Sequence, residues 1–130
     1  MTNLFQYKKF TMHSGGTSNF KIECDAITDQ DYKTLAKLIA QKYNFKEVHG
    51  IPRGGVPFEN ALKEYVTNDN NNLLIVDDVL TTGGSMEEAK SKFADHGYDN
   101  VFGVVVFARG QSKNWIKSMF QLENFFAENA

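Results

Sequence analysis

Apolar residues at helical spacing mark three segments of the chain. They are Tyr32, Leu35, Ala36, Ile39 and Tyr43 in the first, Phe58, Ala61, Leu62 and Tyr65 in the second, and Met86, Ala89 and Phe93 in the third. Residues three and four apart share one helix face, so each segment is expected to be an amphipathic helix. Thr28 and Asp31 form a capping pair ahead of the first. Pro57 suits the first turn of the second helix, and Gly97 is expected to stop the third.

Continuous apolar runs separate these helical segments. Residues 73–76 and 101–107 are almost wholly apolar, as expected of parallel strands covered on both faces. A shorter strand is expected at residues 46–49, and two more at residues 10–12 and 20–24 around a turn at residues 14–18. Strand and helix alternate from residue 28 on. This alternation predicts a single α/β domain, a parallel sheet flanked by helices, behind a small leading section of residues 1–27.

Composition limits where and with what such a domain acts. The chain has 130 residues, a net charge of −2 and a pI near 5.9, so no positive field favours nucleic acid as a partner. Its single cysteine cannot form an internal disulfide, which fits a reducing compartment. No apolar stretch reaches the length of a membrane span or a signal peptide. We expect a cytoplasmic protein with no membrane partner.

Two adjacent aspartates, Asp77 and Asp78, directly follow the most apolar run. In open α/β sheets ligands bind at the carboxyl ends of the strands, where these side chains are expected to lie. Two carboxylates can accept hydrogen bonds from vicinal hydroxyls, such as those of a ribose. They can also attract a divalent cation that a phosphate-bearing ligand shares. The alternative is an acidic strand end and glycine turn without a ligand.

The loop after the aspartates is rich in hydroxyl groups and glycine. It consists of Thr81, Thr82, Gly83, Gly84 and Ser85. Glycines let backbone N–H groups converge on an anion, and the start of a helix adds partial positive charge. No lysine follows the glycines and Gly-x-Gly-x-x-Gly is absent, so neither the nucleoside-triphosphate loop nor the dinucleotide fingerprint fits. The segment predicts a site for a sugar phosphate.

Two segments resemble those of a known family. Residues 76–85, Val-Asp-Asp-Val-Leu-Thr-Thr-Gly-Gly-Ser, closely resemble the phosphoribosyl-pyrophosphate signature of the type I phosphoribosyltransferases. Residues 50–57 resemble that family's pyrophosphate-binding loop. Residues 10–20 are similar to the N-terminal hood of the orotate enzymes, and residues 107–110 fall where those enzymes have a base-contacting arginine. The resemblance covers residues 10 to about 110 and implies the family's α/β fold, with residues 1–27 as the hood and 28–130 as the core.

The resemblance implies a role for each matching residue. Asp77 and Asp78 would hold the ribose 2′- and 3′-hydroxyls, directly or through Mg²⁺. Arg109 would pair with an acidic base such as orotate, and His13 stands where the hood normally has lysine. The remaining substrate-binding residues would be Ile51, Pro52, Arg53, Gly54 and Gly55 at the pyrophosphate, and Val79, Leu80, Thr81, Thr82, Gly83, Gly84 and Ser85 at the 5′-phosphate. Arg53, Arg109 and His13 could instead be exposed residues without a ligand.

One departure from the orotate enzymes keeps the function open. Those enzymes carry an extra strand and a mobile basic loop before the strand that begins here at residue 73, often serving the neighbouring subunit's site. Here only residues 63–72 intervene, ending in an asparagine-rich turn. The cover that excludes water is therefore expected to be missing. Three functions remain: an orotate-like phosphoribosyltransferase using Mg²⁺, a non-catalytic binder of phosphoribosyl pyrophosphate or a nucleotide, and a purine-base phosphoribosyltransferase. A homodimer also stays open.

Overall fold

The structure, a computed structural model, describes residues 26–109 and 113–121 in full, and elsewhere only the backbone of residue 122 and of four short strands. These strands are β1 (Phe5–Gln6), β2 (Phe10–Thr11), β3 (Thr17–Ser18) and β4 (Lys21–Ile22). β1 pairs with β4 and β2 with β3, both antiparallel. Two of the four fall inside the predicted strands. The predicted turn was too long, because Thr17 and Ser18 belong to a strand.

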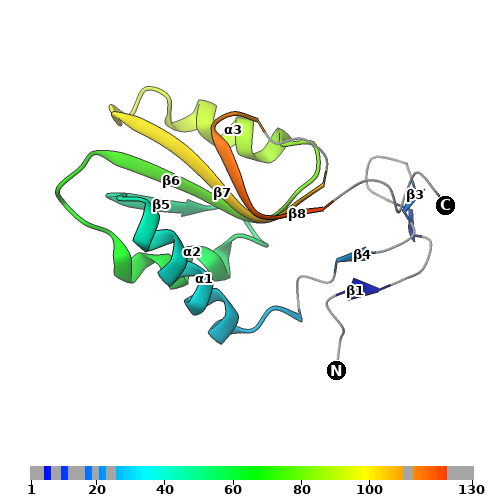
Figure 1. Cartoon of the computed structure of the whole chain (residues 1–130). Helices are drawn as coiled ribbons and strands as arrows, with labels where there is room; N and C mark the ends of the chain where they lie inside the picture. The colour runs from blue at the N-terminus through cyan, green and yellow to red at the C-terminus, as the bar shows by residue number, and fades with distance from the viewer. Residues whose placement is uncertain are drawn as a thin grey trace.

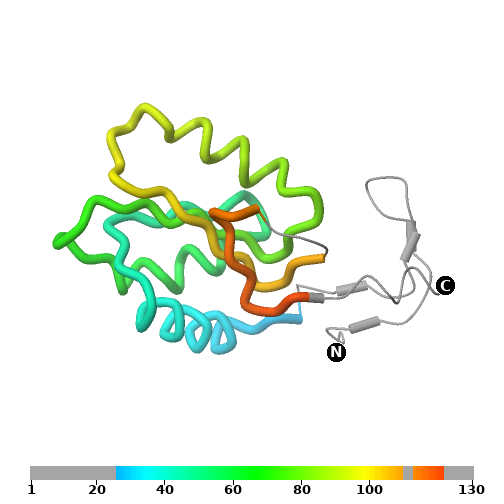
Figure 2. Tube along the Cα trace, turned by 45° about the horizontal axis from the view of Figure 1, so that its top comes forward, coloured from blue at the N-terminus to red at the C-terminus, as the bar shows by residue number. Residues whose placement is uncertain are grey.

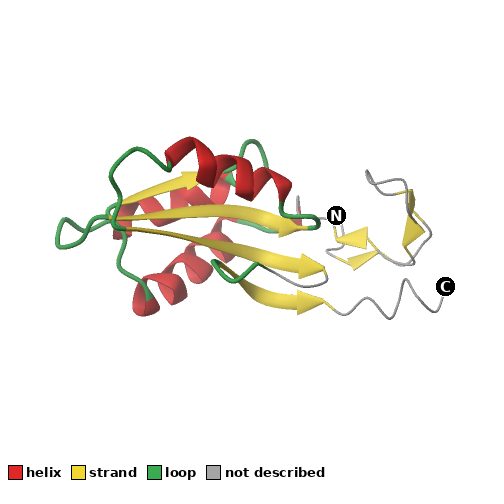
Figure 3. Cartoon of the chain, turned by 90° about the horizontal axis from the view of Figure 1, so that it is seen from above, coloured by secondary structure: helices red, strands yellow, loops and turns green. Residues whose placement is uncertain are grey.

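A four-stranded sheet forms the centre of the described core (Figure 1). β5 (Glu47–Gly50), β6 (Asn72–Leu80), β7 (Asn100–Arg109) and β8 (Ile116–Leu122) lie in that order and run parallel. Helices α1 (Asp29–Lys42) and α2 (Val56–Leu62) cover one face, and α3 (Gly84–Phe93) covers the other (Figure 3). The predicted parallel sheet flanked by helices is confirmed.

Strand β6 holds the two layers together, because its side chains alternate between them. Leu74 and Val76 pack with α1 and α2, whereas Leu73 and Ile75 pack with α3. Each of the four is at most 1% exposed. Burying one such side chain stabilises the fold by about 1.5–3 kcal/mol. The continuous apolar run at residues 73–76 is therefore a strand covered on both faces, as predicted.

The helix ends follow local hydrogen bonds. At the start of α1, the Asp31 N–H donates to Thr28 Oγ1 at 3.1 Å, and the Thr28 N–H donates to Asp31 Oδ2 at 2.9 Å. This is the capping box that the sequence predicted. Helix α3, however, ends at Phe93 and not at Gly97. The Ser91 and Phe93 carbonyls accept from the N–H groups of Ala94 and His96 in tight turns, and Gly97 adopts a φ of 81° in the loop that follows.

Strand β8 was not predicted. It pairs with β7 from Gly103–Ile116 to Arg109–Leu122, and Ile116 is buried in the α3 layer. Parallel neighbours usually need a crossover of a dozen or more residues, whereas only residues 110–115 join these two strands. In the described part of the chain, no helix is both long and apolar enough to cross a membrane.

Candidate functional site

Asp77 and Asp78 lie within β6, which was expected to end before them and instead runs to Leu80. The pairing of β6 with β7 passes from Asp77–Val105 to Val79–Phe107 and skips Asp78. The Asp78 N–H donates to Asp77 Oδ1, and the Val79 N–H donates to Asp78 Oδ1, both at 2.8 Å. The carboxylates thus satisfy backbone donors at this irregular point, which lets the strand continue through two adjacent charges.

The side-chain alternation of β6 shifts by one residue across this acidic pair. Val76 packs with α1 and α2, yet so does Val79, three positions later. Leu80 packs in the α3 layer. In a regular strand, residues an odd number of positions apart face opposite sides, so one step of the alternation is lost over Asp77 and Asp78. The side chain of Leu80 is buried in the core, and that of Val79 is half-buried against it.

The two aspartates differ in their electrostatics. Burial, followed by the hydrogen bond and the charge of Asp78, raises the pKa of Asp77 from its ordinary value of 3.8 to about 7, and a backbone hydrogen bond opposes this rise. Asp77 is therefore partly protonated near neutral pH. Asp78 lies on the side of the sheet where the loop after β5 packs.

That loop, residues 51–55, packs directly onto β6. The Ile51 N–H donates to the Val76 carbonyl at 2.9 Å, and the Gly55 N–H closes the loop on the Ile51 carbonyl at 2.8 Å. A Cβ on Gly54 would lie 2.7 Å from the carboxyl carbon of Asp78, and one on Gly55 would lie 2.6 Å from the Val76 carbonyl oxygen. At Gly55 the neighbouring atoms are backbone, so only glycine allows this approach. The Pro52–Arg53 peptide bond is cis.

A cleft of about 380 Å³ opens beside this loop. It is lined by Ile27, Asp29, Tyr32, Arg53, Gly54, Pro57 and Asp78. Three predicted site residues, two from the loop after β5 and one from β6, therefore meet in one cleft. Asp29 and Tyr32, from the first turns of α1, were not predicted to lie here, because helical periodicity explains Tyr32 without a ligand and an acidic residue is common in the first turn of a helix.

The second loop, residues 81–85, remains open. Thr81, Thr82 and Ser85 are exposed, and Gly83 begins α3 with a φ of 84°. The Gly84 N–H lies 3.4 Å from Thr82 Oγ1. Hydroxyl groups and the first N–H groups of α3 are thus gathered at a helix start, an arrangement suited to an anion.

Arg109 ends β7, beside the carboxyl end of β6. It is half-buried, and burial lowers the pKa of its guanidinium from the ordinary value; a guanidinium nonetheless stays charged in proteins. Ile51 is also half-buried, and Pro52 and Arg53 are exposed. His13 lies outside the described residues, so its predicted place at the base remains a prediction.

The connection from α2 to β6 lies at the opposite end of the sheet. After η2 (Lys63–Tyr65) the chain is held by three long-range bonds: the Thr67 N–H to the Phe45 carbonyl, and the side-chain amides of Asn71 and Asn72 to the carbonyls of Gly97 and Asn44. Figure 2 shows this connection (green) at one end of the molecule and the end of β8 (orange-red) at the other. It cannot cover the carboxyl ends of the strands.

Comparison with known proteins agrees with this geometry, although no protein-family model matches the chain. The curated orotate phosphoribosyltransferase of Pyrococcus horikoshii is 28% identical, covering 89% of this chain and 80% of the relative. That of Methanocaldococcus jannaschii is 27% identical, covering 90% and 83%. The solved orotate phosphoribosyltransferase of Aeropyrum pernix superposes with a TM-score of 0.76 at 18% identity, covering 92% and 88%. The chain resembles the type I phosphoribosyltransferases of the orotate kind. The predicted family resemblance and fold are confirmed, and the relatives support a phosphoribosyltransferase.

The same comparison bears on the mobile loop that covers the site in the orotate enzymes and that the sequence predicts to be missing here. The alignment with the P. horikoshii enzyme spans 148 residues, more than the 130 residues of this whole chain. The relative therefore contains residues without a counterpart here. This agrees with the short connection between α2 and β6.

Proposed function

We propose that the protein binds phosphoribosyl pyrophosphate with Mg²⁺ and transfers the phosphoribosyl group to a nitrogenous base, as an orotate-like phosphoribosyltransferase. One observation carries the proposal: Asp78 of β6 and Arg53 and Gly54 of the loop after β5 line a single cleft. The open helix start at residues 81–85 follows the same strand. A ligand with two phosphate-bearing ends and a diol between them suits this arrangement.

Each part of the ligand has a proposed partner. Asp77 and Asp78 would accept hydrogen bonds from the ribose hydroxyls, and the loop of residues 81–85 would hold the 5′-phosphate. The loop of residues 51–55, with Arg53, would hold the pyrophosphate, because a guanidinium and closely spaced N–H groups match its oxygens. Arg109 would face an acidic base, with His13 of the hood beside it.

The acidic pair suits a hard divalent cation, since carboxylate oxygens are its preferred protein ligands. Among the residues that the structure describes, no group of three or more histidine, cysteine, aspartate or glutamate side chains could hold a metal unaided. Asp77 and Asp78 would therefore share Mg²⁺ with the oxygens of the ligand. Bound there, the cation would neutralise charge on the departing pyrophosphate.

The chain's own residues act by binding and by charge. Displacement at ribose C1 makes the sugar ring oxocarbenium-like, and nearby carboxylates stabilise that positive charge. The two loops hold both ends of the ligand, which orients C1 towards the base. No covalent nucleophile is required.

A panel of bases tests this function. Purified protein is incubated with Mg²⁺, phosphoribosyl pyrophosphate and either orotate, uracil, adenine or hypoxanthine, and pyrophosphate release is followed. A reaction without a base measures the release that hydrolysis alone produces. We expect release with orotate above that level, and we expect it to stop when Mg²⁺ is chelated. Release above that level with the purines and not with orotate would favour the purine-base alternative, and no increase with any base would contradict a transferase.

A non-catalytic binder is the second candidate, favoured by the connection between α2 and β6. Because that segment is tied to the far end of the sheet, water should reach ribose C1. Single-turnover transfer to orotate is compared with release of free ribose 5-phosphate. Slow transfer with hydrolysis is expected; tight binding with neither product would favour the binder.

We also propose a cytoplasmic location.

We further propose a homodimer, in which the second copy would cover the site of the first. Sedimentation with and without phosphoribosyl pyrophosphate tests this, since a monomer that transfers rapidly without hydrolysis needs no such cover.

A further inference from the structure

The loop of residues 51–55 begins directly after the regular pairing of β5 with β6. That pairing keeps one register from Glu47–Leu73 to Gly50–Val76, and the Ile51 N–H continues it by donating to the Val76 carbonyl at 2.9 Å. Neighbouring residues of a strand direct their N–H groups to opposite edges. Because the Ile51 N–H is directed to β6, the Gly50 N–H is directed away from β6.

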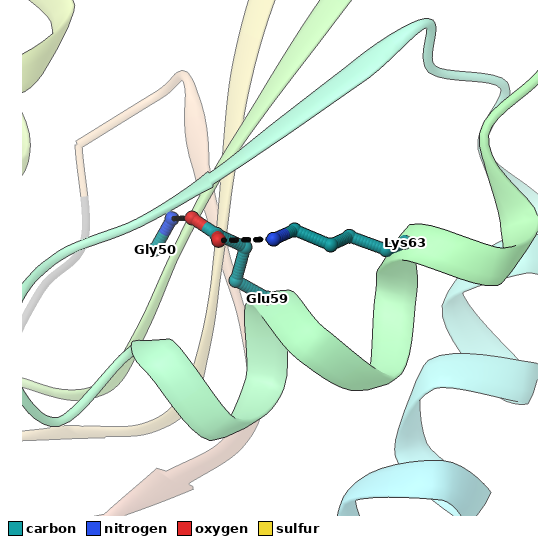
Figure 4. Close-up of polar contacts among 3 residues, drawn as sticks. All are labelled: Gly50, Glu59 and Lys63. Atoms are coloured by element: carbon teal, nitrogen blue, oxygen red, sulfur yellow. Dashed lines mark hydrogen bonds and ion pairs between the residues drawn. The ribbon is translucent and has the colours of Figure 1, made fainter.

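β5 is the outer strand of the described four-stranded sheet, so the Gly50 N–H meets no further strand and needs another acceptor, because the residue is buried. The acceptor is Glu59 of α2, whose Oε1 lies 2.6 Å from the Gly50 nitrogen (Figure 4). The position also excludes any side chain, since a Cβ on Gly50 would lie 2.8 Å from the Gly55 carbonyl carbon. The last residue of β5 thus packs against the last residue of the loop.

Glu59 contacts the residue just before the loop and the last residue of the loop. Its own N–H donates to the Gly55 carbonyl at 3.0 Å, while its side chain accepts from Gly50. The other carboxylate oxygen lies 3.3 Å from Lys63 Nζ, one helical turn along. The Glu59 side chain is 19% exposed and that of Lys63 is 60% exposed, so the ion pair itself contributes little. The inward bond to Gly50 is the stronger restraint, because a charged acceptor strengthens it.

We propose that Glu59 is a positioning residue for pyrophosphate: it fixes the loop of residues 51–55, and with it Arg53, in the form that receives the diphosphate. Glu59 does not line the cleft, so it acts through the loop and not on the ligand. The inference rests on the proposed function. The inference goes beyond the proposed function, because it assigns the positioning of the pyrophosphate-binding loop to a residue outside the cleft.

The two ends of the ligand separate this role from general support of the fold. Inorganic pyrophosphate probes the loop of residues 51–55, and ribose 5-phosphate probes the loop of residues 81–85, which follows a different strand. Both are titrated calorimetrically with Mg²⁺ into wild-type protein and the variants Glu59→Ala, Glu59→Gln and Glu59→Asp. Glu64→Ala, which removes an exposed glutamate five positions on, is the matched control. Thermal unfolding is recorded for every variant.

Glu59→Ala leaves the buried Gly50 donor without its acceptor, so pyrophosphate affinity is expected to fall about tenfold or more. Ribose 5-phosphate affinity should stay within about twofold, since its loop keeps every contact. Glu59→Gln keeps an acceptor oxygen and should retain most of the pyrophosphate affinity, whereas Glu59→Asp, one methylene shorter, should not. Glu64→Ala should match wild type for both probes.

Three results would overturn the inference. They are unchanged pyrophosphate affinity in Glu59→Ala, an equal loss for both probes, and Glu59→Gln behaving like Glu59→Ala. If Glu59→Ala does not fold, Glu59→Asp decides by the same comparison with Glu59→Gln. Wild-type protein that binds neither probe would instead contradict the proposed function, and the inference with it.

Discussion

The loop after β5 and the loop after β6 use glycine for opposite purposes. In residues 50–55 the glycines allow close packing: Gly55 packs on the Val76 carbonyl and Gly54 on the Asp78 carboxylate. In residues 81–85 the glycines leave room, and a Cβ on Gly84 would find only Thr82 Oγ1, at 3.6 Å. The first loop packs closely against β6, whereas the second leaves open space at the start of α3. A diphosphate and a single phosphate could therefore meet differently constructed sites.

The acidic pair joins the two loops, so its loss should have the largest effect. Asp77→Asn with Asp78→Asn is expected to weaken Mg²⁺-dependent binding of phosphoribosyl pyrophosphate by about a hundredfold or more, because both charged acceptors are lost. The fold should survive, since the carboxylates repel each other in the empty site. Calorimetry measures affinity and circular dichroism checks the fold. Wild-type affinity in the double variant would contradict the proposed contact of Asp77 and Asp78 with the ribose hydroxyls.

The packed loop should tolerate less change than the open loop. Gly55→Ala places a methyl group against the Val76 and Ile51 backbone and should lower the free energy of unfolding by about 3 kcal/mol, as overpacking does. Gly84→Ala is the matched control and should change it by less than about 0.5 kcal/mol, because the site has room. Urea unfolding measures both. Equal losses would show that the two loops are built alike.

A larger side chain should instead separate binding from stability at the open loop. Gly84→Val should weaken binding of ribose 5-phosphate about tenfold or more, because it blocks approach to the helix start. Pyrophosphate binding should not change. Trp115, the only tryptophan in the chain, donates to Glu87 of α3 at 2.7 Å, so its fluorescence reports whether α3 is intact. Wild-type affinity for ribose 5-phosphate would contradict a phosphate site here.

The remaining effect is expected in the pH dependence of stability. The pKa of Asp77 is about 7 in the folded protein, above its ordinary value of 3.8. The folded state therefore holds this proton more tightly, and the contribution of Asp77 to stability is complete below about pH 4 and lost as the pH rises through about 7. Asp77→Asn should remove this contribution to the decrease in stability between about pH 4 and pH 7, as measured by urea unfolding. An unchanged slope would mean that Asp77 titrates normally.

The sequence predicted the long, regular elements and the chemistry at their ends. Helix α1 and strands β6 and β7 followed from periodicity, because burial on one or two faces dictates where apolar residues lie. The signature at residues 76–85 and the glycine-rich loop before it located the candidate site. Both depend on residues close together in the chain.

What the sequence did not predict depends on contacts between distant residues. Strand β8 was missed because Ile116, Met119 and Phe120 do not alternate strictly and its link to β7 is unusually short. Strand β6 extends beyond its predicted end, because the aspartates accept their neighbours' N–H groups. The bond from Gly50 to Glu59 has no sequence pattern, since any acceptor of suitable length nine residues away would serve.

The central claim is that the two loops hold opposite ends of one ligand, and competition calorimetry tests it most directly. Pyrophosphate and ribose 5-phosphate are titrated with Mg²⁺ singly, together and in the presence of phosphoribosyl pyrophosphate. We expect pyrophosphate and ribose 5-phosphate to bind at the same time. We expect phosphoribosyl pyrophosphate to displace both and to bind more tightly than either. Mutual exclusion of the fragments, or failure of phosphoribosyl pyrophosphate to displace them, would contradict it.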